Sequence, residues 1–158
     1  EGATASCVGG PDAVEGLVAL GSIGASVMVA GACEAALRLT ADYTKSRQQF
    51  DKAIATFQAV SQRAGDAYID TEAVRLTAWQ AVWRTENDLP SAEAVLSAKF
   101  WAAEGAWRVM HAAHHLHGGV GVDRDYPLHR FFLLHKQLEL QLGSTQPSLL
   151  RLGRLLTA

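Results

Sequence analysis

Six histidines are the first residues in this sequence to suggest chemistry. All lie between His111 and His135, and His111 and His115 are four residues apart, on one face of a helix. Neutral imidazoles at this spacing can chelate a metal ion, but a further ligand is needed. Glu104 is two turns from His111, and neither an H-E-x-x-H motif nor the paired Glu-x-x-His pattern of di-metal bundles occurs. We therefore predict no metal site and interpret the histidines as core, rim or ligand-contacting residues.

Two further features have chemistry suited to contacting a ligand. Arg47 is followed by Phe50, and a guanidinium can clamp a diphosphate, although a cation at a helix end is often only solvated. Gly118 and Gly119 either stop a helix or let backbone approach a ligand where a Cβ would collide. No strand precedes this GGVG turn, so it is not a dinucleotide-binding fingerprint. Spacing alone identifies no catalytic residue.

Helices must position these residues. Apolar residues recur at steps of three or four, and the predicted helices span about 12–46, 56–87, 91–117, 128–142 and a short segment near Pro147. Asp12 is the expected N-cap of the first helix. The predicted fold class is all-α: an antiparallel bundle of about four main helices over residues 12–158, because the connections are short. Residues 1–11 are expected to be an N-terminal loop, the remnant of a missing upstream domain.

Composition excludes several classes of protein. The 158 residues are 49% hydrophobic and 19% charged, with a net charge of −2, so a basic nucleic-acid-binding surface is not expected. The longest uncharged run, from Leu17 to Cys33, is short and rich in Gly and Ala, which predicts no membrane span. Cys7 and Cys33 fit a reducing compartment or an incidental pair. With no basic leader visible, we expect a cytoplasmic protein.

Three segments, in order, resemble the C-terminal helical domain of flavin-dependent acyl-CoA dehydrogenases. The first, YTKSRQQFDKAIATFQAV, is similar to that family's Y-x-x-x-R-x-x-F-G-x-x-I-x-x-x-Q stretch. The second is AKFWAAEGAWRVMHAAHHLHGGVGVDRDYPLHR, which resembles the run that contains Gly-Gly and Tyr-Pro. The third, LGSTQPSLLRLGRLL, resembles the Glu-Gly-Thr-Ser ending. The resemblance covers about residues 16–158 and implies an FAD-containing enzyme that dehydrogenates acyl-CoA thioesters between Cα and Cβ.

The resemblance also implies roles for matching residues. Arg47 and Phe50 would approach the adenosine diphosphate part of FAD bound in a neighbouring subunit, and Gln58 falls on a flavin-contacting Gln. Gly118 and Gly119 would let backbone pass close to the same nucleotide. An assembly of acyl-CoA dehydrogenase-like subunits, either a homo-oligomer or a hetero-oligomer, is therefore expected.

The remaining matches lie nearer the reacting groups, and here the sequence departs from the family. Ser144 and Gln146 would line the flavin and acyl-CoA site, and His115 replaces a cofactor-contacting Gln. The family's base is usually a Glu just before the Gly-Thr turn, where this sequence has Leu142, and leucine cannot accept a proton. In some members the Glu lies on the first helix of the domain, and the matching position is near Gly21.

Three interpretations remain open. In the first, the chain is a subunit or fragment that contributes FAD contacts and an oligomer interface, while a base-bearing partner supplies catalysis; in the second, His115, His117 or Glu139 is an unforeseen base. In the third, the chain is a helical interaction module without flavin. The heteromeric members of the family that it resembles often act on bulky acyl chains such as steroid side chains, which suggests lipid or steroid catabolism by analogy.

Overall fold

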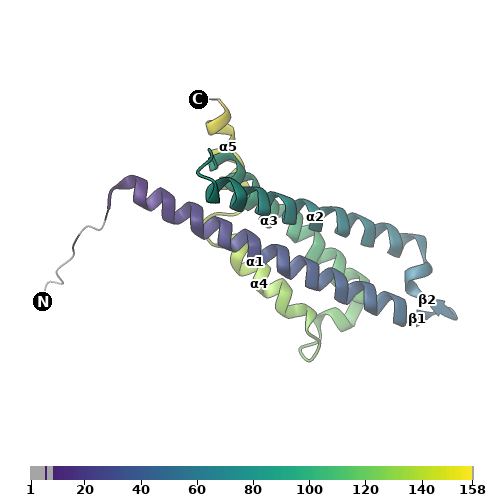
Figure 1. Ribbon diagram of the computed structural model, residues 1–158. Helices are drawn as coiled ribbons and strands as arrows, with labels where there is room; N and C mark the ends of the chain where they lie inside the picture. The colour runs from purple at the N-terminus through teal and green to yellow at the C-terminus, as the bar shows by residue number, and fades with distance from the viewer. Residues whose placement is uncertain (1–5, 7–8, 158) are drawn as a thin grey trace, which may run out of the picture.

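The protein is a bundle of long helices (Figure 1). The computed structural model describes Ser6 and residues 9–157. The helices are α1 Pro11–Ser46, α2 Gln58–Glu86, α3 Ala92–His117, α4 Leu128–Leu140 and α5 Thr145–Leu156. Successive helices from α1 to α4 run in alternating directions, and α5 lies near the N-terminal half of α1. The prediction of an all-α bundle is confirmed.

Helix α1 is the longest element and packs against α2, α3 and α4. It begins at Pro11, after Gly10 as N-cap, so the prediction of Asp12 as the cap is wrong; Asp12 lies in the first turn, where its charge suits the helix dipole. By length and composition α1 resembles a membrane span, and 44% of its most apolar window is buried inside the bundle. A core helix meets the same criteria, so the absence of a span stays a prediction.

A tight hairpin, which the sequence did not predict, joins α1 to α2. Its strands are β1 Gln48–Gln49 and β2 Lys52–Ala53, followed by the 3-10 helix η1 Ile54–Thr56. Phe50 and Asp51 occupy the turn with φ values of 52° and 63°, the left-handed conformation that a two-residue hairpin requires. Glycine and asparagine are the usual signals for this turn, and neither is present.

Small side chains allow the helices to approach closely. Ala36 and Ala106 are fully buried beside Met110 in the main core cluster. A Cβ on Gly105 of α3 would lie 3.2 Å from the side chain of Val74 on α2, so this glycine permits the close contact between the two helices. The Ala-rich composition that favours helix formation therefore also sets the spacing of the bundle.

Cys33 is a free thiol in the same core. Burial raises the pKa of this thiol to about 12, with smaller contributions from nearby carboxylates. A thiol with such a pKa remains protonated and unreactive at neutral pH. Cys7, its predicted incidental partner, lies outside the described residues.

The chain reverses twice after α3. The 3-10 helix η2 Gly118–Val122 leads into α4, and a turn at Leu142 and Gly143, both with positive φ, leads into α5. Helix α5 begins at Thr145 with Ser144 as its N-cap, two residues before the predicted start at Pro147. This turn carries the last group of predicted site residues.

Candidate functional site

The predicted site residues fall into two groups near opposite ends of the bundle (Figure 1). One group surrounds the C-terminal ends of α1 and α3 and the start of α2: Arg47, Phe50, Gln58, His115, Gly118 and Gly119. The other group is the turn between α4 and α5 with Leu142, Ser144 and Gln146, which lies against the N-terminal halves of α1 and α3. From Lys99, beside the turn, to His117 is 18 residues of α3, or about 27 Å.

Three rings join the ends of α1 and α3 in the first group. Tyr43 stacks on His117 with ring centroids 4.4 Å apart, and Tyr126 donates a hydrogen bond to Nε2 of His117 at 3.0 Å. Because the Ala113 carbonyl can only accept, Nδ1 of His117 carries the proton and donates at 2.8 Å. Burial lowers the pKa of His117 and keeps it neutral. This cluster fixes Arg47, one turn after Tyr43, relative to the diglycine.

The surface around this cluster is open and suited to an anion. Arg47 is exposed and makes no ion pair with any described carboxylate, and Phe50 is 86% exposed. Gly118 has φ +61°, and a Cβ on either Gly118 or Gly119 would meet nothing within 4 Å. The exposed side chain of Gln58 opens α2 at the same end. A free guanidinium, an exposed ring and unshielded backbone fit a nucleotide diphosphate.

The histidines of α3 lie in different surroundings. His111 packs against the Trp107 ring at 4.2 Å, and the exposed His115 side chain has no polar partner among the described residues. Within the described part of the chain, no three His, Cys, Asp or Glu side chains are placed to hold a metal ion. His115 adjoins the diglycine turn, where its carbonyl accepts the Gly118 N–H.

The second group brings together the two positions at which the resembling family carries its base. A Cβ on Gly21 of α1 would lie 2.7 Å from Cδ1 of Leu142. These positions are 121 residues apart in the sequence and in contact in the fold, which is what alternative locations of one base require. Neither of these two positions carries a carboxylate.

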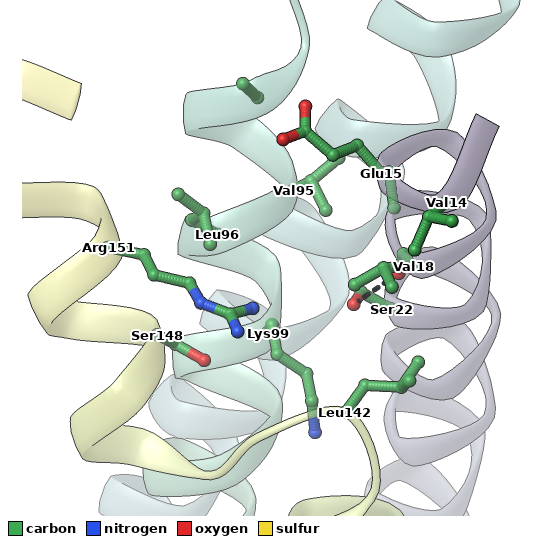
Figure 2. A pocket seen from close by; sticks show the side chains of 12 residues that line it. Val14, Glu15, Val18, Ser22, Val95, Leu96, Lys99, Leu142, Ser148 and Arg151 are labelled. Atoms are coloured by element: carbon green, nitrogen blue, oxygen red, sulfur yellow. Dashed lines mark hydrogen bonds between the residues drawn. The ribbon is translucent and has the colours of Figure 1, made fainter. Parts of the chain in front are cut away.

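A buried lysine that the sequence reasoning missed holds this turn (Figure 2). Lys99 is 2% exposed and donates to the carbonyl oxygens of Leu138 and Glu139 at 2.7 and 3.1 Å. A cation at the C-terminal end of α4 satisfies carbonyls that have no partner within the helix. Desolvation lowers the pKa of Lys99, and Glu139 opposes the shift. A single lysine within the apolar run AVLSAKFWAA was the available signal.

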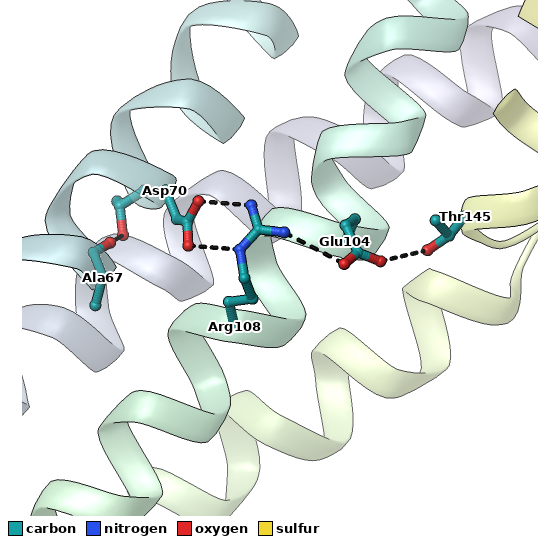
Figure 3. A network of polar contacts seen from close by, with 6 residues as sticks. Ala67, Asp70, Glu104, Arg108 and Thr145 are labelled. Atoms are coloured by element: carbon teal, nitrogen blue, oxygen red, sulfur yellow. Dashed lines mark hydrogen bonds and ion pairs between the residues drawn. The ribbon is translucent and has the colours of Figure 1, made fainter. Parts of the chain in front are cut away.

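A polar chain holds the other side of the turn (Figure 3). Asp70 of α2 accepts two hydrogen bonds from Arg108 at 2.6 and 2.8 Å, Arg108 also contacts Glu104 at 3.2 Å, and Glu104 accepts from Thr145 at 3.4 Å. This series of polar contacts therefore links α2 and α3 to the first residue of α5. Together with Lys99, it positions the turn that carries Ser144.

None of the three suggested substitute bases lies beside Leu142 and Gly21. His115 and His117 are near the far end of α3, and His117 is already hydrogen bonded on both ring nitrogens. Glu139 pairs with Lys136 at 2.6 Å and lines a separate small cavity. Leu142 instead borders a cleft of about 480 Å³ between α1, α3 and α5.

Comparison with known proteins identifies the domain. Residues 9–156 match the family model of the acyl-CoA dehydrogenase C-terminal domain. The chain is 46% identical over 155 residues to acyl-CoA dehydrogenase FadE27 of Mycobacterium tuberculosis, which covers 93% of this chain and 42% of that protein. The chain thus spans about two fifths of the length of this relative.

Solved structures agree with this match. A chain of the ChsE4–ChsE5 complex from Mycobacterium tuberculosis has a TM-score of 0.91 at 47% identity, over 95% of this chain and 41% of that one. A variant of the Tcur3481–Tcur3483 steroid ACAD has a TM-score of 0.89 at 43% identity, over 94% and 41%. Butyryl-CoA dehydrogenase from Megasphaera elsdenii has a TM-score of 0.85 at 29% identity, over 89% and 37%.

Proposed function

This chain belongs to the acyl-CoA dehydrogenase family, and we propose that it acts as a base-lacking subunit or domain within a heteromeric, FAD-dependent acyl-CoA dehydrogenase. It contributes FAD contacts and oligomer interface, and a partner subunit supplies the base. The observation that carries the proposal is the contact between Gly21 and Leu142, the two positions available for a base, with no carboxylate at either.

The separation of the two groups supports a role in two nucleotide sites. Arg47 and the diglycine lie about 27 Å along α3 from the level of the Ser144 turn, so the two groups serve different cofactors or different subunits. At the first end, Arg47, Phe50, Gln58, His115 and backbone at the diglycine hold the adenosine diphosphate part of a neighbour's FAD.

At the other end, Ser144 and Gln146 face the flavin and acyl-CoA side. FAD, when bound, supplies the hydride acceptor. Lys99 and Glu104 hold this turn in place, and the Leu142 side chain cannot take a proton.

An exposed aromatic surface on α2 supports assembly with other subunits. Trp79 and Trp83 are 57% and 58% exposed, and Leu76 on the same helix is 56% exposed. Large apolar side chains in this number are typical of protein interfaces. The related ChsE4–ChsE5 and Tcur3481–Tcur3483 structures each pair two proteins, and the latter is called a steroid ACAD. We therefore infer a hetero-oligomer acting on steroid-type or other bulky acyl-CoA thioesters, in the cytoplasm.

Co-expression tests the division of labour. The chain, in its complete natural protein, is purified with and without a paralogue that carries the Glu-Gly-Thr turn, and flavin content and α,β-dehydrogenation are measured for each. We expect activity only in the mixed assembly. Full activity of the homo-oligomer refutes the base-lacking role, and the absence of flavin from every assembly favours the helical interaction module.

Gly119→Ala tests the nucleotide contact with little effect on folding. A Cβ at this position meets nothing in the chain, so stability should be unchanged, whereas a nucleotide passing close to the backbone collides with the methyl group. We expect Gly119→Ala to weaken FAD retention in the assembly. Arg47→Ala should weaken it as well, because loss of a charge-assisted contact reduces the free energy of FAD binding by about 1.5–3 kcal/mol. Gly153→Ala, also in open space on α5, is the matched control. Equal FAD retention in all three variants would show that this end of the bundle does not contact FAD.

A further inference from the structure

The hairpin between α1 and α2 carries two cations on one of its faces. Gln49 of β1 pairs directly with Lys52 of β2, so their side chains lie on the same face. Arg47 lies two residues before Gln49 in extended backbone, and its carbonyl accepts the N–H of Ile54 at 2.9 Å, which continues the same register. Side chains two residues apart on a strand share a face. Arg47 and Lys52 are therefore diagonal neighbours, a separation that long side chains can span.

An aromatic ring directs the Lys52 side chain towards α2. The Nζ atom of Lys52 lies 4.7 Å from the centroid of the Phe57 ring, which is the geometry of a cation–π contact. Phe57 is the N-cap residue of α2 and directly precedes Gln58. The exposed ring of Phe50 lies perpendicular to that of Phe57, with centroids 6.3 Å apart. The ammonium is thus held among residues of the proposed nucleotide end.

Neither cation is neutralised by this part of the bundle. Arg47 and Lys52 are exposed, and neither forms an ion pair with a carboxylate of the described residues, Asp51 in the turn between them included. Helix α2 begins at Gln58 with no side-chain cap, so its first N–H groups add partial positive charge nearby. A nucleotide diphosphate, with a negative charge on each phosphate, matches a pair of free cations.

We propose that Lys52 is a second cation for the diphosphate of a neighbouring subunit's FAD and acts as a pair with Arg47. This inference rests on the proposed function, because it adds a residue to the same nucleotide end. The guanidinium supplies directed hydrogen bonds and the ammonium supplies a compact charge. Phe57 holds the ammonium in place before binding, so less side-chain freedom is lost on binding. The family pattern R-x-x-F-G-x-x-I leaves position 52 open, so no motif identifies this lysine.

The dissociation constant of FAD from the mixed assembly of complete natural proteins tests the pair, with flavin fluorescence after dilution as the readout. Lys52→Met keeps the apolar stem but removes the charge, and should raise this Kd about tenfold. Lys45→Met is the matched control, because Lys45 is an exposed lysine in the last turn of α1, before the hairpin; it should bind FAD normally. Phe57→Leu should raise the Kd less, and should have no further effect when added to Lys52→Met.

Ionic strength separates a charge contact from a packing effect. Raising the salt concentration from about 0.05 M to about 0.5 M should weaken FAD binding by a larger factor in wild type than in Lys52→Met, because salt screens exposed charges. Circular dichroism melts verify that each variant is folded.

Three results would overturn the role of Lys52. They are FAD binding by Lys52→Met as tight as by Lys45→Met, a salt dependence of Lys52→Met equal to that of wild type, and an effect of Phe57→Leu that persists in the Lys52→Met background. Arg47→Ala should weaken FAD retention under the proposed function whether or not Lys52 takes part. The two proposals therefore fail separately.

Discussion

Lys99→Met removes the buried ammonium that joins α3 to the end of α4. Methionine fills nearly the same apolar space, so packing is largely retained and the loss is confined to the charge and its hydrogen bonds. The carbonyl oxygens of Leu138 and Glu139, now bonded at 2.7 and 3.1 Å, lose their donor.

The magnitude follows from these two carbonyls. Each buried acceptor left without a partner costs about 1–3 kcal/mol. Two opposing effects favour the lower end of the sum: the cost of burying the ammonium, which lowers the pKa of Lys99, disappears, and water can reach the half-buried Glu139. We expect a loss of about 2–3 kcal/mol in the free energy of unfolding. For a domain of this size, that lowers Tm by about 5–10 °C.

Urea unfolding and calorimetry measure this change, with Lys136→Met as control. The Lys136 side chain is 40% exposed and pairs with Glu139 at 2.6 Å, and ion pairs near the surface contribute about 1 kcal/mol or less. Hydrogen exchange should also accelerate at amides 140–146, which a simple packing defect elsewhere in α3 would not cause. If Lys99→Met is as stable as Lys136→Met, the lysine does not hold this turn and the reasoning is wrong.

Three further predictions concern stability. Burial lowers the pKa of His135 below the unfolded value near 6.5, so the unfolded state binds a proton at a higher pH than the folded state. The free energy of unfolding should therefore fall as the pH drops below about 6.5, by at most about 1.4 kcal/mol per pH unit. His135→Phe should make urea unfolding less pH-dependent between pH 7 and 5.5, and an unchanged dependence contradicts this. Gly118→Ala should lower the free energy of unfolding by about 1–3 kcal/mol, because the φ of Gly118 is +61°. Gly119→Ala should leave it unchanged in the same denaturation assay. Equal stabilities of the two variants would show that a side chain at Gly118 causes no strain. Asp70→Asn should lower the free energy of unfolding by about 1 kcal/mol, since the Arg108 partner is partly exposed. A Tm equal to that of wild type would show that this ion pair does not stabilise the contact between α2 and α3.

Helices could be predicted well because their signals are local. The end of the first helix near Ser46 and the stop at Gly118 were both foreseen, since the Ala-rich period and the diglycine act within a few residues. The hairpin at Phe50 and Asp51 was not, because its two turn residues include neither glycine nor asparagine, the usual signals for a left-handed turn.

By itself the sequence determined the all-α class, the order of the helices, the family and the absence of a carboxylate at Leu142. Periodicity and motif spacing contain all of this information, because they depend on residues near one another in the chain. Only the tertiary structure decided that Gly21 meets Leu142, that the predicted contacts form two groups at opposite ends, and that Lys99 holds the end of α4. Those facts depend on how helices cross, and side chains far apart in the chain meet only after the bundle has packed.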